Sequence, residues 1–468
     1  MQLSSKQLSI ALILSTLFLC LPAFYNNIPL IFPDSSAYVF AGFTNSNLGP
    51  RVWTYGGFVR HMSLAETLWL VVLLQGFLVS ASIYLLFKYI FKTTNPWHFL
   101  FYILLISWTT AVSLHTSRVM PDIFTPLIVL HLGLLLFAPT MSKLDRVLSG
   151  FLFFVSLSMH NSHTVIVVLM LLALGVGAIF PSIRNLYKNS SLTRKKLGQV
   201  GGLLVACYLF VCTLHWSVGG GFRATQGGSI FLFARLIDYN IAQDYLEEHC
   251  EEMDAHICTH RHTIDWGAKF LWGAEASSLP QHGHWSEENK IFYQTLVKDI
   301  LTTPKYLLRY LIRSVETTAA QLFYVDYDPI SERWHQWMFG ATSHHYKHYR
   351  ISIEQGRQAR LDYRDADVGW MNHWQHLVFL GSIVIVFWSL LYAQLPWAIR
   401  ATTLLIILGL VVNAFIAAAT SGVYDRYQSR IAWLITLPAF WLICQWWEQL
   451  PSNNKASSIP TKASQICL

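Results

Sequence analysis

The chain is 468 residues long, with 53% apolar residues and only 13% charged ones, where an average soluble domain has about 25% charged residues. These proportions exclude a disordered chain, a nucleic-acid-binding arm and an ordinary soluble enzyme, and they indicate a multi-pass membrane protein. Because 20 of the 26 acidic residues lie between Gly219 and Asn372, the formal charge of +7 arises in the apolar remainder and predicts no nucleic-acid partner.

Ten apolar segments come close to the length of about 20 residues that a helix needs to cross the hydrocarbon core. In chain order they are residues 7–25, 64–87, 97–113, 122–138, 147–160, 163–180, 199–218, 373–394, 397–420 and 429–447. The first follows Lys6 and resembles a signal sequence, but no small-residue cleavage site comes after it, so we expect an uncleaved anchor. The sequence predicts an all-α polytopic membrane protein, with seven spans and a first outer loop (26–63) in residues 1–218 and three spans in residues 373–447.

Residues 219–372 form a separate acidic segment between the seventh and eighth spans. Helical patterns run over about 230–248 and 287–303, and Pro304 suits the first position of a further amphipathic helix that extends to about Phe323. This last helix is expected either to lie on the bilayer surface or to pack on the domain. We predict a large, mainly helical domain here, and a disordered cytoplasmic tail over 448–468.

The cations predict the orientation of the chain. With the N-terminus inside, the short inner loops and tails carry thirteen Lys and Arg residues, and the short outer loops carry five. Short cationic loops stay in the cytoplasm, and the cluster Arg194-Lys195-Lys196 is the strongest anchor of this kind. Both termini are therefore expected in the cytoplasm, with the 219–372 domain on the outer side.

Two cysteines, Cys250 and Cys258, lie eight positions apart in the predicted outer domain. In an oxidising compartment such a pair predicts a disulfide. The alternative is a zinc site that includes one or more nearby histidines: His249, His256, His260 or His262. The spacing fits no standard zinc pattern, so the disulfide is the preferred interpretation.

Polar residues gather at the predicted outer ends of the spans, where a cavity open to the outside would bring them together. Asp34 follows Pro33 at a plausible helix start. It is expected either to cap that helix or to act as a carboxylate base whose pKa is raised by surroundings of low dielectric constant.

Arg118 and Asp122 lie four residues apart at the entry of the fourth span. They predict either a pair that anchors this helix or an anion-binding Arg118, with Asp122 orienting it or contacting substrate. His160 and His163 join the fifth and sixth spans. Hydrogen bonding to a sugar or phosphate, or placement at the membrane interface, is expected there rather than metal binding.

The last span opens with Asp425, Arg426 and, one turn later, Arg430. The two arginines share one helix face, and paired guanidinium groups suit phosphate because their donors match two oxygens. The alternative is that these side chains snorkel to the membrane surface. Since outer cations are few in this chain, phosphate recognition is the preferred interpretation.

The layout resembles the GT-C class of membrane glycosyltransferases, which have about ten or more spans and use polyprenyl-phosphate-linked sugars on the outer or lumenal side. Their first outer loop carries an acidic residue, often followed by Tyr, and Pro33-Asp34-Ser35-Ser36-Ala37-Tyr38 stands in that place. Arg118-Val119-Met120-Pro121-Asp122 is similar to a feature near the fourth span of these enzymes. Many members have a second acid directly after the first, whereas here Ser35 follows, and this leaves a need for a divalent cation open.

The resemblance implies a glycosyltransferase of a bacterial inner membrane, with the 219–372 domain in the periplasm and an envelope molecule as acceptor. Asp34 would be the catalytic base and Asp122 a further catalytic residue; the substrate would be bound by Tyr38, Arg118, His160, His163, Asp425, Arg426 and Arg430. Its partners would be a lipid-linked sugar donor and membrane lipids. One alternative is a transporter or flippase of a lipid-linked or anionic substrate, although the sequence shows no repeat-related broken helices. Another is a non-catalytic envelope assembly protein.

Overall fold

The computed structural model describes residues 5–45, 51–93, 95–253, 256–327, 355–358 and 365–449, and within them the chain is helical, with one isolated β-bridge between Leu30 and Arg118. The predicted tail lies outside these residues from 450 onward. The first half of the chain contains α1 (Ser5–Leu19), α2 (Leu21–Asn26), α3 (Pro33–Thr44), α4 (Trp53–Met62), α5 (Trp69–Leu86), η1 (Phe87–Phe91), α6 (Pro96–Thr109), α7 (Val112–Ser117), η2 (Pro121–Ile123), α8 (Phe124–Phe137), α9 (Lys143–Ser158), α10 (Asn161–Gly177), α11 (Pro181–Asn189) and α12 (Arg194–Ser217). The second half contains α13 (Gly228–Asp238), α14 (Ile241–His249), η3 (His256–His260), α15 (Gly267–Trp272), η4 (Leu279–His282), α16 (Glu287–Thr302), α17 (Pro304–Phe323), α20 (Asp365–Tyr392), α21 (Trp397–Thr420), α22 (Asp425–Ala432), η5 (Trp433–Ile435) and α23 (Thr436–Gln449).

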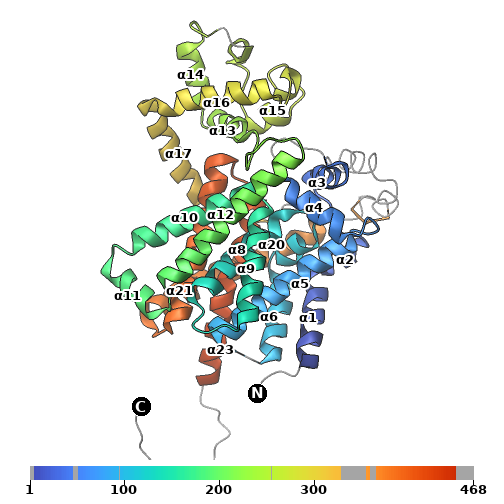
Figure 1. The fold of residues 1–468 in the computed structure, drawn as a ribbon, viewed down its shortest axis with the longest axis vertical. Coiled ribbons are helices and arrows are strands. Elements are labelled where there is room, and N and C mark those ends of the chain that lie inside the picture. Colours follow the sequence, from blue (N-terminus) through green and yellow to red (C-terminus); the bar gives the residue numbers. More distant parts are fainter. Residues whose placement is uncertain are drawn as a thin grey trace, which may run out of the picture.

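These elements form two units, each with its own apolar core (Figure 1). Helices α1–α12 and α20–α23 make up the larger unit, which we call the helical body. Residues 228–323, from α13 to α17, form a smaller helical domain at one end of that body. The start of α1 and the end of α23 lie at the other end, so both ends of the described chain are remote from the helical domain.

A helix stands at each of the ten predicted span positions, but within the described residues only four helices are long and apolar enough to cross a membrane by themselves. They are Trp69–Phe91, Arg194–Ser217, Gly369–Tyr392 and Trp397–Thr420. A fifth candidate is α10 with α11, which meet at an angle of 111°. The remaining predicted spans are shorter helices, and a crossing at all ten positions stays a prediction.

Proline and extended residues explain why several predicted spans are interrupted. The first predicted span ends as α1 at Leu19, and Pro22 lies in the first turn of the short α2 that follows. Proline lacks the amide N–H that would continue a helix. The third predicted span stops at Thr109 because Thr110 is extended. Short helices joined at angles therefore take the place of straight transmembrane helices. Polar side chains are found near these joints.

The helical domain confirms two of the predicted helices and divides a third. α16 begins at Glu287, directly after Ser286, whose side chain accepts the amide N–H of Asn289, and α17 begins with Pro304, as expected. The predicted helix over 230–248 is wrong as one element, since Asn240 has a φ of 56° and separates α13 from α14. Cys250 and Cys258 form a disulfide directly after α14.

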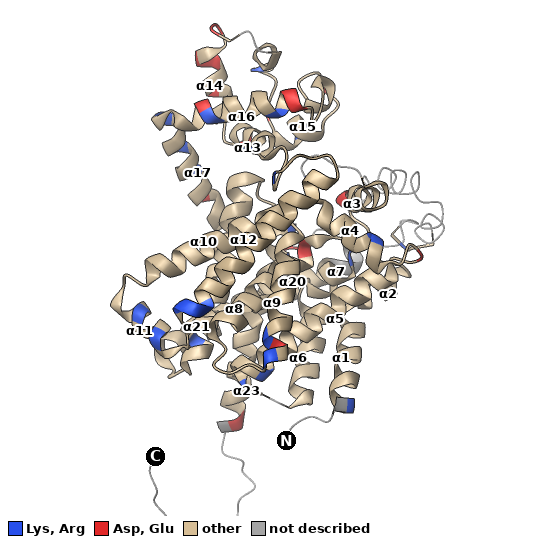
Figure 2. Cartoon of the chain, viewed as in Figure 1, with Lys and Arg blue, Asp and Glu red and all other residues tan. Residues whose placement is uncertain are grey.

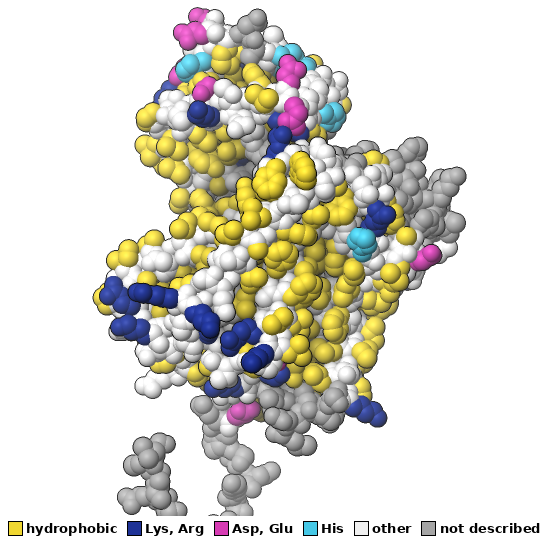
Figure 3. Space-filling model, in the orientation of Figure 1, with side chains coloured by type: hydrophobic (Ala, Val, Ile, Leu, Met, Phe, Trp, Pro, Cys, Tyr) yellow, Lys and Arg dark blue, Asp and Glu magenta, His cyan; other side chains and the backbone are white. Residues whose placement is uncertain are grey.

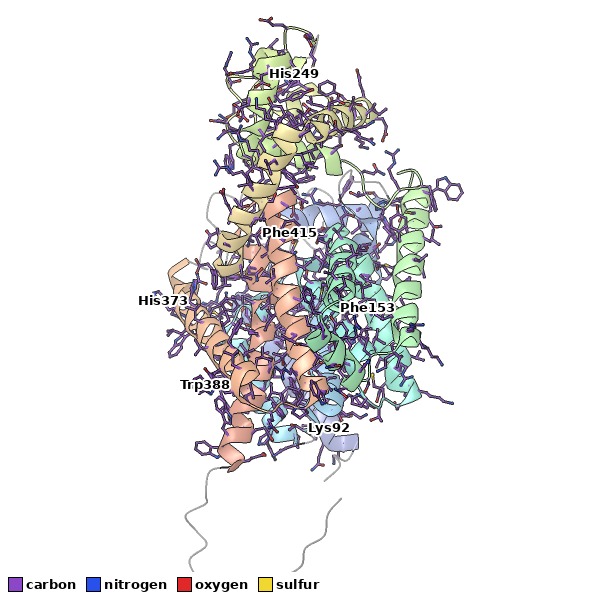
Figure 4. All side chains as sticks on the ribbon, turned by 90° about the vertical axis from the view of Figure 1, so that its left-hand side faces the viewer. Lys92, Phe153, His249, His373, Trp388 and Phe415 are labelled. Carbon is purple, nitrogen blue, oxygen red and sulfur yellow. A yellow bond between two sulfur atoms is a disulfide. The ribbon has the colours of Figure 1, made fainter. Side chains whose placement is uncertain are left out.

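Helix α17 joins the helical domain to the body by packing along α21, close to the labelled Phe415 (Figure 4). The amphipathic helix therefore packs on the body through one face, while Leu308, Ile312 and Val315 on another face are exposed. At the end of α21, Arg235 Nε donates to the carbonyl oxygen of Ala418 at 2.6 Å. The last carbonyls of a helix lack partners within it and carry partial negative charge, so this contact stabilises the end of α21.

Surface charge divides along the long axis of the molecule. Lys and Arg gather at the end of the body that holds the N-terminal end of α1, on α11 and at the starts of α9 and α12 (Figure 2). Between that end and the helical domain, the visible face of the body is largely covered by hydrophobic side chains (Figure 3). Hydrophobic side chains gathered on this face of the body indicate a membrane-embedded surface.

Candidate functional site

The candidate site begins where the loop before α3 pairs with the segment before η2. The amide of Leu30 donates to Ser117 O, and the amide of Val119 donates to Leu30 O, both at 2.9 Å. Ser35 extends this contact, because its hydroxyl donates to Val119 O at 2.8 Å. These bonds bring the start of α3 next to the segment that carries Arg118 and Asp122.

Ser35, not Asp34, completes the start of α3. Phe32 is the residue before the helix, and its amide donates to the Ser35 hydroxyl at 2.9 Å, which is one of the two bonds of a capping box. The capping role proposed for Asp34 is therefore wrong. Asp34 lies in the first helical turn, where the helix dipole favours a negative charge.

Asp34 instead pairs with two arginines from distant parts of the chain. One carboxylate oxygen contacts Arg51, and the other lies 3.3 Å from Arg426 Nη1. Burial by itself raises the pKa of Asp34, but the charges and hydrogen bonds of Arg51 and Arg426 outweigh it, so the pKa is lowered from its usual value. The expectation of a raised pKa is wrong for this arrangement. The Asp34 side chain keeps 26% of its surface exposed.

Two glycines bring Arg51 close to Asp34. Helices α3 and α4 cross in backbone contact at Gly42 and Gly56, where a β-carbon on Gly42 would lie only 2.0 Å from Gly56 O. Only a residue without a side chain fits such a crossing. Arg51 lies two residues before the start of α4, and its guanidinium also lies over the ring of Trp272 in the helical domain, 5.6 Å from the ring centre. Arg51 therefore links Asp34 to the surface of that domain.

A second ion pair lies deeper. Arg430 Nη1 and Asp122 Oδ1 are 3.0 Å apart, and both side chains are only 3% exposed. Arg430 Nη2 also donates to Asn413 Oδ1 of α21 at 2.9 Å. The partner of Asp122 therefore comes from α22, 308 positions along the chain, whereas the sequence suggested a local pair with Arg118.

The helical domain positions α22. Gln321, near the end of α17, accepts the amide N–H of Tyr424 and donates to Tyr424 O, both at 2.8 Å. Asp425 accepts the amide N–H of Arg426 at 2.6 Å, which satisfies a donor of the first helical turn. These bonds hold the start of α22 so that Arg426 and Arg430 both reach the candidate site.

Two guanidinium groups lie over the ring of Phe32. The guanidinium carbon of Arg426 is 4.5 Å from its ring centre, and that of Arg118 is 4.8 Å away. Arg118 is fully buried and donates to the hydroxyl of Tyr327 at 3.3 Å. Cation–π contacts stabilise guanidinium groups that are removed from water, so Phe32 supports a site with several arginines in a small volume.

The other predicted residues border this cluster. Tyr38 is buried, with its ring edge-on to Tyr55 at 5.1 Å between centres. His160 caps α10 by accepting the amide N–H of Ser162 at 3.2 Å. His163 is buried and bonded at both ring nitrogens, to Thr125 Oγ1 and Ser156 O. Of the two histidines, only His160 retains surface that a ligand can reach.

Several residues of the site were missed in the sequence. Arg51 is one of the five cations of the predicted short outer loops, and its place among so few is the signal that could have identified it. Gln75 is a lone amide in an apolar span, and it donates to the carbonyl oxygens of Thr116 and Arg118 at 2.8 and 2.9 Å. Gln358 donates to and accepts from the backbone of Ile31, and no local pattern indicated this contact.

The donor set does not fit a divalent cation. Asp34 and Asp122 each face at least one guanidinium, Asp425 accepts the amide N–H of Arg426, and the hydroxyl of Ser35 is already used by Phe32 and Val119. Carboxylates neutralised by arginine are poor ligands for hard cations. The partly exposed arginines Arg51 and Arg426 suit an anion, and Asp34 between them suits a hydroxyl group. No protein-family model, curated protein or solved structure matches this chain.

Proposed function

We propose that this protein is an integral membrane glycosyltransferase that moves a sugar from a polyprenyl-phosphate donor to a hydroxyl of an envelope acceptor, on the outer face of a bacterial inner membrane. The observation that supports it most strongly is the ion-paired cluster in which Asp34, Arg51 and Arg426 meet. A carboxylate beside two guanidinium groups provides a proton acceptor and a phosphate-binding pair in one place.

In the proposed reaction, the donor phosphate binds Arg51 and Arg426 and takes over their hydrogen bonds from Asp34. The acceptor hydroxyl donates its proton to the freed carboxylate, and its oxygen forms a bond to the anomeric carbon. The bond between that carbon and the phosphate oxygen breaks, and polyprenyl phosphate leaves with the electron pair. When Arg51 and Arg426 bind the phosphate instead of Asp34, the carboxylate of Asp34 becomes more basic, because their positive charges no longer stabilise its ionised form.

Arg430 and Asp122 have a different part in this proposal. Both are almost completely buried and paired with each other, so we assign them to holding α22 against η2 rather than to binding the donor. Arg426 is the more exposed of the two arginines on α22, with 14% of its side chain accessible. This assignment makes Arg426 the phosphate ligand and Arg430 its support.

The charge distribution supports an orientation with both termini in the cytoplasm and the helical domain outside. Single cysteines in place of exposed Lys195 and Glu288, with the native disulfide kept and the other thiols removed, test this topology. We expect an impermeant maleimide to label the Glu288→Cys protein in intact cells, and the Lys195→Cys protein only after permeabilisation. The reverse pattern would overturn the orientation and the proposed outer face together.

Reconstitution tests the function itself. Proteoliposomes that contain the protein and a pool of polyprenyl-phosphate sugars should release free polyprenyl phosphate and form a glycosylated acceptor. Arg426→Gln should weaken donor binding, because a phosphate partner is lost while Asp34 remains. A transporter or flippase would move the lipid-linked sugar across the bilayer with its sugar–phosphate bond intact, and that result would exclude the glycosyltransferase.

A further inference from the structure

Three histidines meet on the surface of the helical domain, away from the candidate site. His256 and His260 stand at the two ends of η3, and His282 ends η4. The ring centres of His256 and His282 are 3.5 Å apart, and those of His256 and His260 are 4.8 Å apart. One ring nitrogen from each residue lies within 4.8 Å of the other two. Three imidazoles from two separate turns therefore converge on one point.

The two turns that carry these rings are fixed to the domain. Between the histidines of η3, Ile257 and Cys258 are buried, and Cys258 is joined to Cys250 by the disulfide. On the other side, Asn289 of α16 donates to the carbonyl oxygen of His282 at 2.5 Å. The buried residues and the covalent link hold η3 against the core, so its two histidines are left at the surface.

The hydrogen bond of His282 determines which of its nitrogens is available. Its Nε2 lies against the carbonyl oxygen of Ala276, an atom that only accepts. Nε2 must therefore carry the proton, and Nδ1 of the neutral ring keeps its lone pair. A backbone carbonyl that orients one ring nitrogen in this way is the usual outer partner of a metal-binding histidine.

We propose that His256, His260 and His282 bind one divalent transition-metal ion, with Zn²⁺ as the ion that suits three imidazole nitrogens. Tetrahedral zinc with Zn–N bonds of about 2.0–2.1 Å needs ligand nitrogens about 3.3 Å apart, so side-chain rotations of these surface rings have to bring the nitrogens closer by about 1.5 Å. Three protein ligands leave a fourth position for water or for a side chain of another molecule. The site rests on the helical domain alone and is independent of the proposed transferase activity.

The ligand atoms of this site determine which metal ions it can bind. Imidazole nitrogens favour Zn²⁺, Ni²⁺ and Cu²⁺, whereas Mg²⁺ and Ca²⁺ require oxygen ligands. The cysteines of this domain are bonded to each other, so the ligand set contains no thiolate. The predicted alternative of a zinc site built on Cys250 and Cys258 is thereby replaced by one that adds His282, a residue 22 positions beyond His260.

Titration calorimetry of the full-length protein tests the proposal. The protein should carry no affinity tag, be freed of metal with a chelator and be kept without reductant, so that the disulfide stays closed. We expect the wild-type protein to bind one Zn²⁺ at these residues, with no competition from Mg²⁺. His260→Gln or His282→Gln should weaken binding by more than about 100-fold, since loss of even an outer partner costs 10–100-fold.

His262→Gln is the matched control, because His262 lies two residues beyond His260, with its side chain 66% exposed, and is outside the cluster. It should bind Zn²⁺ as the wild type does. Equal affinity in the His260, His282 and His262 variants would overturn the proposal, and so would zinc binding that develops only after reduction of the disulfide.

Cobalt provides a test that needs no variant. Co²⁺ bound by three imidazoles and water should give visible d–d bands without the near-ultraviolet charge-transfer band of thiolate ligands. If the disulfide-intact wild-type protein shows neither saturable Zn²⁺ binding nor a Co²⁺ spectrum, the proposed site is wrong, whatever the folding of the variants.

Discussion

Asp34→Asn is expected to lower turnover by about 10²–10⁴-fold, the usual contribution of a general base, while the protein remains folded. Asparagine keeps the shape of the side chain, and its single carbonyl oxygen can still accept from one of the two arginines, but it cannot take a proton from the acceptor hydroxyl. Ser35 rather than Asp34 caps α3, so the start of that helix should be unaffected. The measurement is product formation in proteoliposomes, with donor binding and thermal unfolding followed in parallel.

Ser36→Ala is the control for this prediction. Ser36 is the second residue after Asp34, and its hydroxyl donates to the nearby carbonyl oxygen of Pro33 at 3.1 Å. Its loss should leave turnover within about two-fold, since a partly exposed hydrogen bond contributes little. Full activity of Asp34→Asn would remove Asp34 from the mechanism. A loss that follows only from failure to bind the donor would make it a binding residue instead.

The pH dependence of the reaction provides an independent test of proton transfer to Asp34. In the free protein Arg51 and Arg426 lower the pKa of Asp34, so the acid limb of kcat/KM should lie below the usual aspartate value of about 3.9. If the donor phosphate takes over the arginines, the acid limb of kcat should lie at higher pH. The lowered pKa also stabilises the fold above the unfolded pKa, and this contribution is lost as pH falls through the folded one.

Arg430→Gln is expected to have the largest effect on stability, about 3–5 kcal/mol of unfolding free energy. The substitution removes the arginine that is directly hydrogen-bonded to the carboxylate of Asp122, which is 3% exposed. The double variant Asp122→Asn, Arg430→Gln should regain part of this loss, because no unpaired charge then remains buried. Thermal unfolding of the detergent-solubilised protein measures both effects.

Arg313→Gln is the matched control for the buried pair. Arg313 pairs with Glu316 at 2.9 Å on the surface of α17, with both side chains about half exposed, and exposed pairs contribute about 0–1 kcal/mol. An equally small effect of Arg430→Gln would show that the α22–η2 contact does not depend on this ion pair. A double variant no more stable than Arg430→Gln would contradict the assignment to Asp122.

Local chemistry in the sequence was enough to determine several parts of this protein. The helical pattern over 287–303 and Pro304 correctly placed α16 and α17, because such a pattern and a helix start depend on a few consecutive residues. The spacing of Cys250 and Cys258 identified the disulfide. The apolar segments each coincide with a helix, since hydrophobic runs and helix propensity act over short stretches.

Only the tertiary structure decided which charged residues meet. Asp34 pairs with Arg426 across 392 positions and Asp122 with Arg430 across 308, and periodicity within one helix carries no information on such distances. The same holds for Arg51, which reaches Asp34 because α3 and α4 cross at two glycines, and for His282, which joins His256 and His260 through the fold of the helical domain. A pattern in the sequence reports which side chains share a face of one element. The crossing and packing of elements, which follow from the shapes of many side chains at once, bring those faces together into a site.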